Sequence, residues 1–312
     1  MLGYLVRRLL GMVPVLFGTT FLIFAAVYAL PGDPLAALAG EKQNLSPAVR
    51  AELTQRYHLD ASLPAQYWHY LSGLFHGDFG EDLRGIDVAD QIARAWPITV
   101  VLALTAWTIM AVAGIGLGML AARRPGGIGD RLVLGITTLA LGVPFFVLAY
   151  VLKIALGLEL GWFPTSGVRE GWPSSYLLPA ACLAAFGVPE LARLTRAGIL
   201  ENRYAEFVDT AIARGLSPTR IAVRHVLRAS LIPVVSVLGL SLGGMLGGVV
   251  LIEGIFSIPG LGYTMFNAID QQNGPVIVGI GSLLVLVFLA INLLVDLTYG
   301  VLDPRVSLER RG

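Results

Sequence analysis

Histidines and neighbouring carboxylates are the residues here that would bind a metal ion if they came together, because imidazole and carboxylate groups are common ligands. His58, His69 and His76 lie in one stretch, with Asp60 and Asp78 nearby. The histidines are eleven and seven residues apart, whereas compact zinc motifs place neighbouring ligands only about two to five residues apart. We therefore predict surface histidines and no metal site.

Motifs for catalysis and nucleotide binding give no support for an enzyme. The metallopeptidase pattern H-E-x-x-H does not occur. Neither of the two lysines, Lys42 and Lys153, stands in the G-x-x-x-x-G-K-[ST] pattern of a P-loop. The sequence thus predicts a non-catalytic chain without a nucleotide site of its own.

The hydrophobic residues are concentrated in six long stretches. They make up 55% of the 312 residues, charged residues make up 14%, and the mean hydropathy is +0.73. Stretches free of Asp, Glu, Lys and Arg cover 9–30, 95–122, 132–152, 171–189, 229–252 and 271–295. Since roughly 20 helical residues cross a bilayer core, we predict an all-α membrane protein with six transmembrane helices. The formal net charge of +1 argues against a nucleic-acid partner.

Basic residues next to the short loops predict the orientation in the membrane. They gather before the first span, between the second and third, between the fourth and fifth, and after the sixth. They are Arg7, Arg8, Arg123, Arg124, Arg131, Arg193, Arg196, Arg203, Arg214, Arg220, Arg224, Arg228, Arg305, Arg310 and Arg311. By the positive-inside rule these loops and both termini are cytoplasmic.

Two long connections divide the chain into three predicted parts. Residues 1–30 form a cytoplasmic stub and the first helix, 31–94 an extracytoplasmic helical cap, and 95–312 a core of five spans with a cytoplasmic loop at 193–230. In the cap, Ser46 and Pro47 form a typical helix start before a predicted helix over 48–57, and Ser62 precedes a second helix that runs to Phe75. A third helix is expected over 88–95, with Val88, Ile92 and Ala95 on one face.

The cytoplasmic loop is predicted to form a helix–turn–helix. The fourth span is expected to continue into water and to end at Gly215, which suits the left-handed position after a helix. Ser217 and Pro218 then begin a new helix that runs to about Ala229. Such a hairpin, held by two membrane helices, is a surface on which another protein can push.

Several motifs of the loop and its surroundings resemble one family. The run DTAIARG at 209–215 looks like the EAA signature of importer-type ABC permeases. Further runs are similar to the dipeptide/oligopeptide/nickel branch, in family order: PGDP at 31–34, GDFG at 77–80, YAEFV at 204–208, ARGLS at 213–217, RHVLR at 224–228, LIP at 231–233, EGIFSIPGLG at 253–262 and LDPR at 302–305. The likeness covers the whole chain and is greatest to the first subunit of that family's permease pair.

The resemblance implies a mechanism and a set of partners. Such a permease pairs with a second permease, two ATPase subunits or domains that hold ATP and Mg, and an extracytoplasmic solute-binding protein, in a bacterial or archaeal cytoplasmic membrane. The chain itself binds no cofactor. A coupling helix near 205–215 sits in a groove of the ATPase, where small residues permit close approach and where Asp209 and Arg214 are candidates for salt links. The coupling-loop residues are Ala205, Glu206, Phe207, Asp209, Thr210, Ala211, Arg214, Gly215, Leu216 and Ser217.

The sequence departs from the family pattern at three places. Asp209 stands where the signature has Glu, and Thr210 where it has Ala. Glu81 and Asp82 follow Gly80 where a Ser is expected. None of these changes affects the predicted fold, although the last lies on the outer face.

Two further features concern the spans. Gly239, Gly243 and Gly247 recur at four-residue spacing in the fifth, which favours close helix packing or a pore lining. The apolar stretch 254–269 is interrupted by a turn and is a candidate re-entrant outer gate, with gate residues Ser257, Pro259 and Gly260.

We favour peptide import as the function of the chain over three alternatives. These are export by an ABC permease, a stand-alone secondary transporter, and an intramembrane hydrolase. The spans carry no unambiguous charge at mid-membrane and show no inverted repeat, which counts against a secondary transporter. A hydrolase would need a nucleophile or metal set within the spans. The sequence does not identify the substrate or the pore-lining residues.

Overall fold

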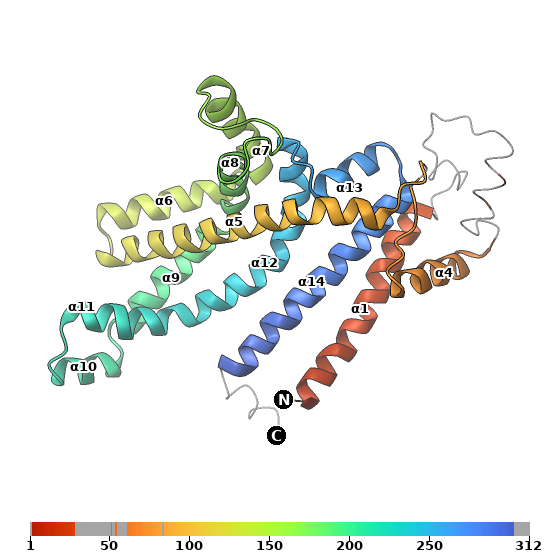
Figure 1. Cartoon of the computed structure of the whole chain (residues 1–312). Helices are drawn as coiled ribbons and strands as arrows, with labels where there is room; N and C mark the ends of the chain where they lie inside the picture. The colour runs from red at the N-terminus through yellow and green to blue at the C-terminus, as the bar shows by residue number, and fades with distance from the viewer. Residues whose placement is uncertain (1, 29–50, 52–53, 55–60, 83, 303–312) are drawn as a thin grey trace. The chain divides into compact units, whose positions relative to one another are not determined.

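The computed structural model describes residues 2–28, 51, 54, 61–82 and 84–302. In these ranges the secondary structure is helical (Figure 1), apart from one isolated bridge between Glu81 and Asp87. The chain forms two compact units: Met1–Val100 with Ser257–Gly312, and Val101–Phe256. The predicted helix over 48–57 lies outside the described residues, apart from 51 and 54.

The long apolar helices among the described residues agree with the prediction of a membrane protein. Two of the six predicted spans, however, are bent pairs of helices and not single helices. Four helical stretches can each span a bilayer alone, namely Val6–Tyr28, Val88–Arg123, Pro218–Phe256 and Gly274–Leu297. Two bent pairs raise the number to six if each pair is one span. They are α6 (Ile128–Gly142) with α7 (Phe145–Leu152) and η1 (Lys153–Glu159), bent by 102°, and α8 (Ser174–Ala184) with α9 (Val188–Asn202), bent by 62°.

Proline explains why the third and fourth predicted spans are not straight helices. Val143 has φ −105° and ψ 123°, the extended conformation that a following proline imposes, and Pro144 then begins α7. Pro189 lies in the first turn of α9, where a proline needs no backbone partner. Continuous helices over 132–152 and 171–189 were therefore wrong, although the apolar stretches themselves are helical.

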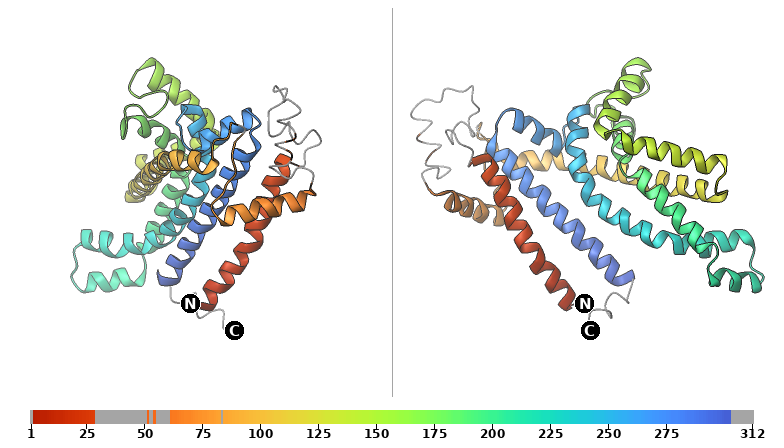
Figure 2. Two further views of the ribbon diagram at one scale, coloured as in Figure 1. Left: turned by 45° about the vertical axis from the view of Figure 1, so that its right-hand side comes forward. Right: turned by 180° about the vertical axis from the view of Figure 1, so that it is seen from behind.

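The first unit is built on α1 (Leu2–Tyr28) and α14 (Gly274–Leu302), which lie side by side (Figures 1 and 2). The short helix α13 (Leu261–Asp270) packs on α14. The core of this unit brings together residues that are distant in the sequence: Val88, Ala95, Leu261, Ala268, Val276 and Ile280. Arg8 and Asp296 form an ion pair between α1 and α14.

The cap and the second span are joined more closely than we expected. Val88 and Ala95 are buried and Ile92 packs beside them, which confirms their shared face. However, the helix does not stop there, because α5 runs without a break over Val88–Arg123. A separate third cap helix was therefore wrong, and the predicted boundary at residue 94 falls inside α5.

Within the first unit, helix α4 (Leu63–Phe75) is held against its neighbours by the hydroxyl groups of two tyrosines. It begins after Ser62, as predicted, although the serine side chain makes no capping bond. The hydroxyl of Tyr67 lies 2.7 Å from Thr20 Oγ1, and that of Tyr70 donates to Ser282 Oγ at 2.8 Å. Two aromatic side chains thus fasten α4 to both α1 and α14.

The second unit contains the remainder of α5, the two bent pairs and the helices that follow them. Its longest helix is α12 (Arg228–Phe256), which packs on α7, α8 and α9. Between α9 and α12 stand three short helices: α10 (Glu206–Ala213), α11 (Pro218–Arg220) and the π-helix η2 (Ile221–Leu227).

Candidate functional site: the loop between α9 and α12

The loop starts with a break that the sequence analysis missed. Helix α9 ends at Asn202, and Ala205 is extended, with φ −74° and ψ 148°, before α10 begins. A single helix from the fourth span to Gly215 was therefore wrong. The break makes α10 a separate helix of eight residues, so its direction can differ from that of α9.

The end of α10 confirms the predicted role of Gly215. This glycine has φ +71°, in the left-handed region that only glycine adopts without strain. Its amide donates to the carbonyl of Ile212 at 2.8 Å, and the amide of Leu216 donates to that of Ala211 at 3.2 Å. The last carbonyl groups of α10 are satisfied in this way, and the chain reverses direction.

The second arm of the hairpin is continuous with the fifth span. Ser217 occupies the N-cap position, with φ −65° and ψ 145°, and Pro218 opens α11. The helix then passes through η2 into α12 without a break. The predicted end at about Ala229 was wrong: one helical stretch, Pro218–Phe256, runs from the turn to the far end of the span.

The hairpin has a small core of its own. Val208 and Ala211 of α10 are buried against Ile221 and Val226 of η2. Ile199 of α9 and Leu216 of the turn pack around them. Since Ala211 points into this core, it is not among the small residues that can approach a partner.

The other side chains of α10 are open to solvent, and we call this exposed surface the outward face. Its side chains include two large apolar groups, Phe207 and Ile212, which are 38% and 59% exposed. In the part of the chain that the structure describes, Asp209 and Arg214 have no salt-bridge partner. The exposed residues of the predicted set are Glu206, Phe207, Asp209, Thr210, Arg214, Gly215 and Ser217, whereas Ala205 and Leu216 are half-buried.

The glycines of α12 are not equivalent. Gly243 is buried and Gly239 half-buried, but Gly247 is exposed, with open space where a Cβ would stand. Gly248 packs closely on α8, since a Cβ there would lie 2.8 Å from Leu183 Cδ1. The glycines of this stretch therefore include one close helix contact, at Gly248 and not at Gly247.

A serine pattern in the same helix also escaped the sequence analysis. Gly-Leu-Ser-Leu-Gly at 239–243 matches G-x-S-x-G, the pattern of a hydrolase nucleophile on a sharp strand-to-helix turn. Here it lies within α12, and the hydroxyl of Ser241 donates to the carbonyl of Leu238 at 2.9 Å. This is the ordinary bond of a helical serine, and the nucleophile turn is not formed.

The candidate gate is a tight turn before α13. Ser257 has φ +49°, a left-handed value that is uncommon for serine, and Gly260 is the N-cap residue of α13. Ser257 and Pro259 are exposed, whereas Ile258 and Gly260 are buried. At the end of the preceding helix α12, the carbonyl of Ile255 accepts a hydrogen bond of 2.5 Å from Lys153 Nζ of η1, and the same ammonium group lies over the Phe256 ring.

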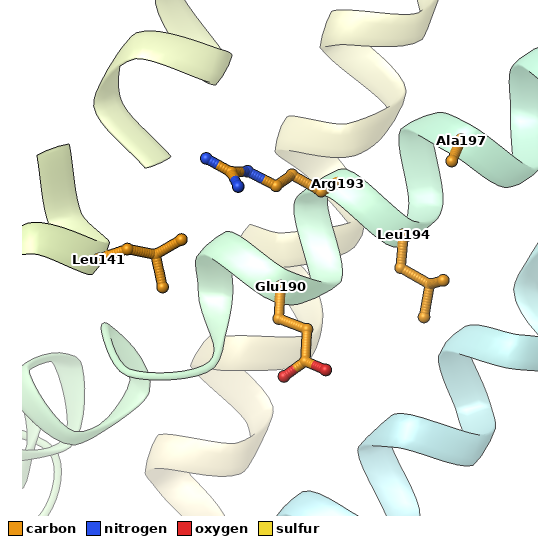
Figure 3. Close-up of a pocket in the computed structure, with 5 residues that line it drawn as sticks. All are labelled: Leu141, Glu190, Arg193, Leu194 and Ala197. Atoms are coloured by element: carbon orange, nitrogen blue, oxygen red, sulfur yellow. The ribbon is translucent and has the colours of Figure 1, made fainter. Parts of the chain in front are cut away.

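An open groove of about 540 Å³ runs along α9 (Figure 3). It is lined by Leu141, Glu190, Arg193, Leu194 and Ala197. The side chains of Glu190 and Arg193 point away from each other. Arg193 instead donates to Thr138 Oγ1 of α6 at 2.8 Å.

Among the described residues, no group of three or more His, Cys, Asp or Glu side chains could hold a metal ion. His69 and His76 lie on and just after α4, and His58 is outside the described residues.

Taken with its apolar spans, this architecture is that of the membrane-embedded subunit of a transport system. Family models support that class. The model described as "Binding-protein-dependent transport system inner membrane component" matches residues 114–308, and its N-terminal companion matches residues 1–84. The chain therefore belongs to this family, and its resemblance to ABC permeases of the peptide and nickel branch is confirmed.

Relatives and a solved structure agree with this assignment. The chain is 36% identical over 307 residues to the "Glutathione transport system permease protein GsiC" of Escherichia coli strain K12, covering 98% of this chain and 99% of that one. The protein of the same name from Shigella dysenteriae serotype 1 matches equally well. The fold resembles a chain of the MetNI methionine ABC transporter in an inward-facing conformation, with a TM-score of 0.53 and 20% identity over 68% of this chain and 96% of that chain.

Proposed function

We propose that this chain is the permease subunit of an ATP-binding-cassette importer for small peptides. It forms half of the translocation pathway and works with a second permease, two ATPase subunits and an extracytoplasmic binding protein. In this proposal the chain crosses the membrane six times, with both termini in the cytoplasm and residues 31–94 outside, as the distribution of basic residues predicts. The observation that carries the proposal is the outward face of α10, on a hairpin with its own core, in a chain of this family.

The geometry of the hairpin suits the transmission of force. Val208, Ala211, Ile221 and Val226 hold α10 against η2, and η2 continues directly into α12. A displacement of α10 by the closing ATPases would therefore be passed to the fifth span without being absorbed in a flexible loop. Phe207 and Ile212 offer apolar area that becomes buried when the ATPase groove covers it.

The proposed substrate class rests on the relatives. Proteins named as glutathione transport permeases align over 98% of this chain. We propose a solute of that chemistry, a short peptide with ionised ends, and glutathione is the first compound to test. The chain needs no cofactor of its own, because ATP and Mg are bound by the partner ATPases.

The experiment has two stages. The tagged chain is first isolated from its native membrane in mild detergent, and the proteins retained with it are identified. We expect a second permease, ATPase subunits and a binding protein, and the recovery of this chain alone would contradict the proposal. The isolated complex is then placed in liposomes, and ATP-dependent accumulation of glutathione and dipeptides is measured.

Two variants test the role of the loop. Asp209→Lys reverses a charge on the outward face, and Gly215→Pro fixes φ near −65° where the turn needs +71°. Both should abolish stimulation of the ATPases by solute while the chain still inserts in the membrane. Glu201→Lys, an equal charge reversal at an exposed position of α9, is the matched control. Normal transport by both loop variants would exclude α10 as the coupling helix.

The direction of transport needs its own measurement. Vesicles of both orientations are compared, with and without the binding protein. Uptake that requires the binding protein supports import. Solute movement in the opposite direction, independent of that protein, would identify an exporter, and movement without any ATPase would identify a secondary transporter.

A further inference from the structure

Helix α9 is tied to α6 by a bidentate ion pair, close to the loop described above. Arg196 Nε donates to Asp130 Oδ1 at 2.6 Å, and its Nη2 donates to Asp130 Oδ2 at 2.8 Å. The backbone amide of Gly126 donates to the same Oδ2 at 2.8 Å. Asp130 is 3% exposed and the Arg196 side chain 24%. Two parallel charge-assisted bonds fix both the distance and the angle between two side chains.

Helix α9 also packs very closely on α5. A Cβ on Gly114 would lie 2.6 Å from the Cβ of Leu191, and one on Gly118 would lie 2.5 Å from that of Thr195. Such distances leave no room for a side chain, so α5 and α9 pack very closely over about one turn, from Gly114 to Gly118. Helix α9 is thus held by close packing on α5 and by the ion pair on α6.

The position of the pair matters because α9 leads directly to α10. Arg196 lies six residues before the end of α9 at Asn202, about 9 Å along the helix axis. Asp130 stands in the first turn of α6, next to the connection between α5 and α6. The pair therefore joins the turn end of the α5–α6 hairpin to the C-terminal half of α9, which leads into α10.

On these grounds we propose that Asp130 and Arg196 are positioning residues for coupling. The pair makes the α5–α6 hairpin move with α9 when α10 is displaced, so that two further segments of the permease follow the ATPases. This inference rests on the proposed function and adds to it a second route, separate from the one through η2 and α12. Packing alone resists compression between helices, whereas the ion pair also resists sliding and separation.

The test uses the complete complex in liposomes and measures solute transported per ATP hydrolysed. Asp130→Asn keeps the shape of the side chain and removes its charge, and Arg196→Lys keeps the charge and removes the planar fork. We expect transport per ATP to fall at least about fivefold in both, the lower range of typical coupling effects. Arg203→Lys, at an exposed position just after α9, is the control and should behave as wild type.

A charge swap separates coupling from folding. In the double variant Asp130→Arg with Arg196→Asp the ion pair is restored in reverse, while the amide of Gly126 loses its acceptor, so transport per ATP should exceed that of Asp130→Arg alone without reaching the wild-type value. The amount of assembled complex is measured for every variant. A variant can lower the amount of assembled complex while the complex that does assemble still transports as much solute per ATP as wild type. In that case the pair is merely structural, and the proposal is overturned.

The result for the unaltered complex distinguishes the two proposals. If it transports solute with ATP, the proposed function stands, and the variants decide the role of the pair. If Asp130→Asn fails to assemble, Arg196→Lys and the charge swap decide it. If the unaltered complex contains no ATPase or hydrolyses no ATP, the proposed function fails, and the coupling role fails with it.

Discussion

The indole Nε1 of Trp107 on α5 donates a hydrogen bond of 2.8 Å to the carbonyl oxygen of Leu238 on α12. The two residues are 131 positions apart in the sequence. Because a helix normally uses its own carbonyl groups, this extra donor specifies how the two long helices of the second unit face each other.

Trp107→Phe should weaken this contact. Phenylalanine keeps an aromatic ring at the site but removes the donor, so we expect a loss of about 1 kcal/mol of unfolding free energy. Thermal unfolding of the purified complex measures it. Trp162→Phe, at a site that is 67% exposed, is the control. Equal shifts for the two variants would contradict a specific role for the indole bond.

The contact between α5 and α9 gives a sharper comparison. Gly118→Ala places a methyl group 2.5 Å from Thr195 Cβ and 2.6 Å from the carbonyl oxygen of Ala192, so the helices must separate. We expect destabilisation of about 1–3 kcal/mol. Gly116→Ala, two residues earlier on the same helix, meets nothing within 4 Å and should be neutral or slightly stabilising. Thermal unfolding of the two variants checks this, and equal stabilities would show that the close approach is not maintained.

The attachment of α4 depends on pH. Burial of Tyr70 raises the pKa of its hydroxyl from 10.0 to about 12, against the smaller opposite effect of the bond to Ser282. A raised pKa means that the folded protein favours the neutral, donating form. This stabilisation is complete below pH 10 and is lost as the pH rises toward 12. We expect Tyr70 to ionise about two pH units later than exposed tyrosines.

Spectrophotometric titration of tyrosinate in wild type and in Tyr70→Phe measures this shift. The variant should show one late-ionising group fewer than the wild type. An unchanged number of late-ionising groups would show that Tyr70 is not one of them. Amide hydrogen exchange in 63–75 should also become faster in Tyr70→Phe, because α4 loses its link to Ser282.

Local chemistry determined which features could be predicted. The left-handed Gly215, the start of α4 after Ser62 and the shared face of Val88 and Ala95 each depend on residues within one or two turns. The bend at Val143–Pro144 has the same kind of local signal, a residue before proline, and a closer reading would have found it.

Other features had no local signal. Asp130 and Arg196 are 66 positions apart, and nothing near either residue indicates the other. The break at 203–205 follows no proline or glycine, and it becomes understandable only once Val208 and Ala211 are seen packed on η2. Long-range packing, which a single sequence does not reveal, decides both.

The small core of the hairpin has a consequence for how such transporters diversify. Val208, Ala211, Ile221 and Val226 pack on one another, whereas Phe207, Asp209, Ile212 and Arg214 are exposed and lie outside this core. If α10 couples the permease to its ATPases, as we propose, the outward face can change to fit a different ATPase without disturbing the packing of the hairpin.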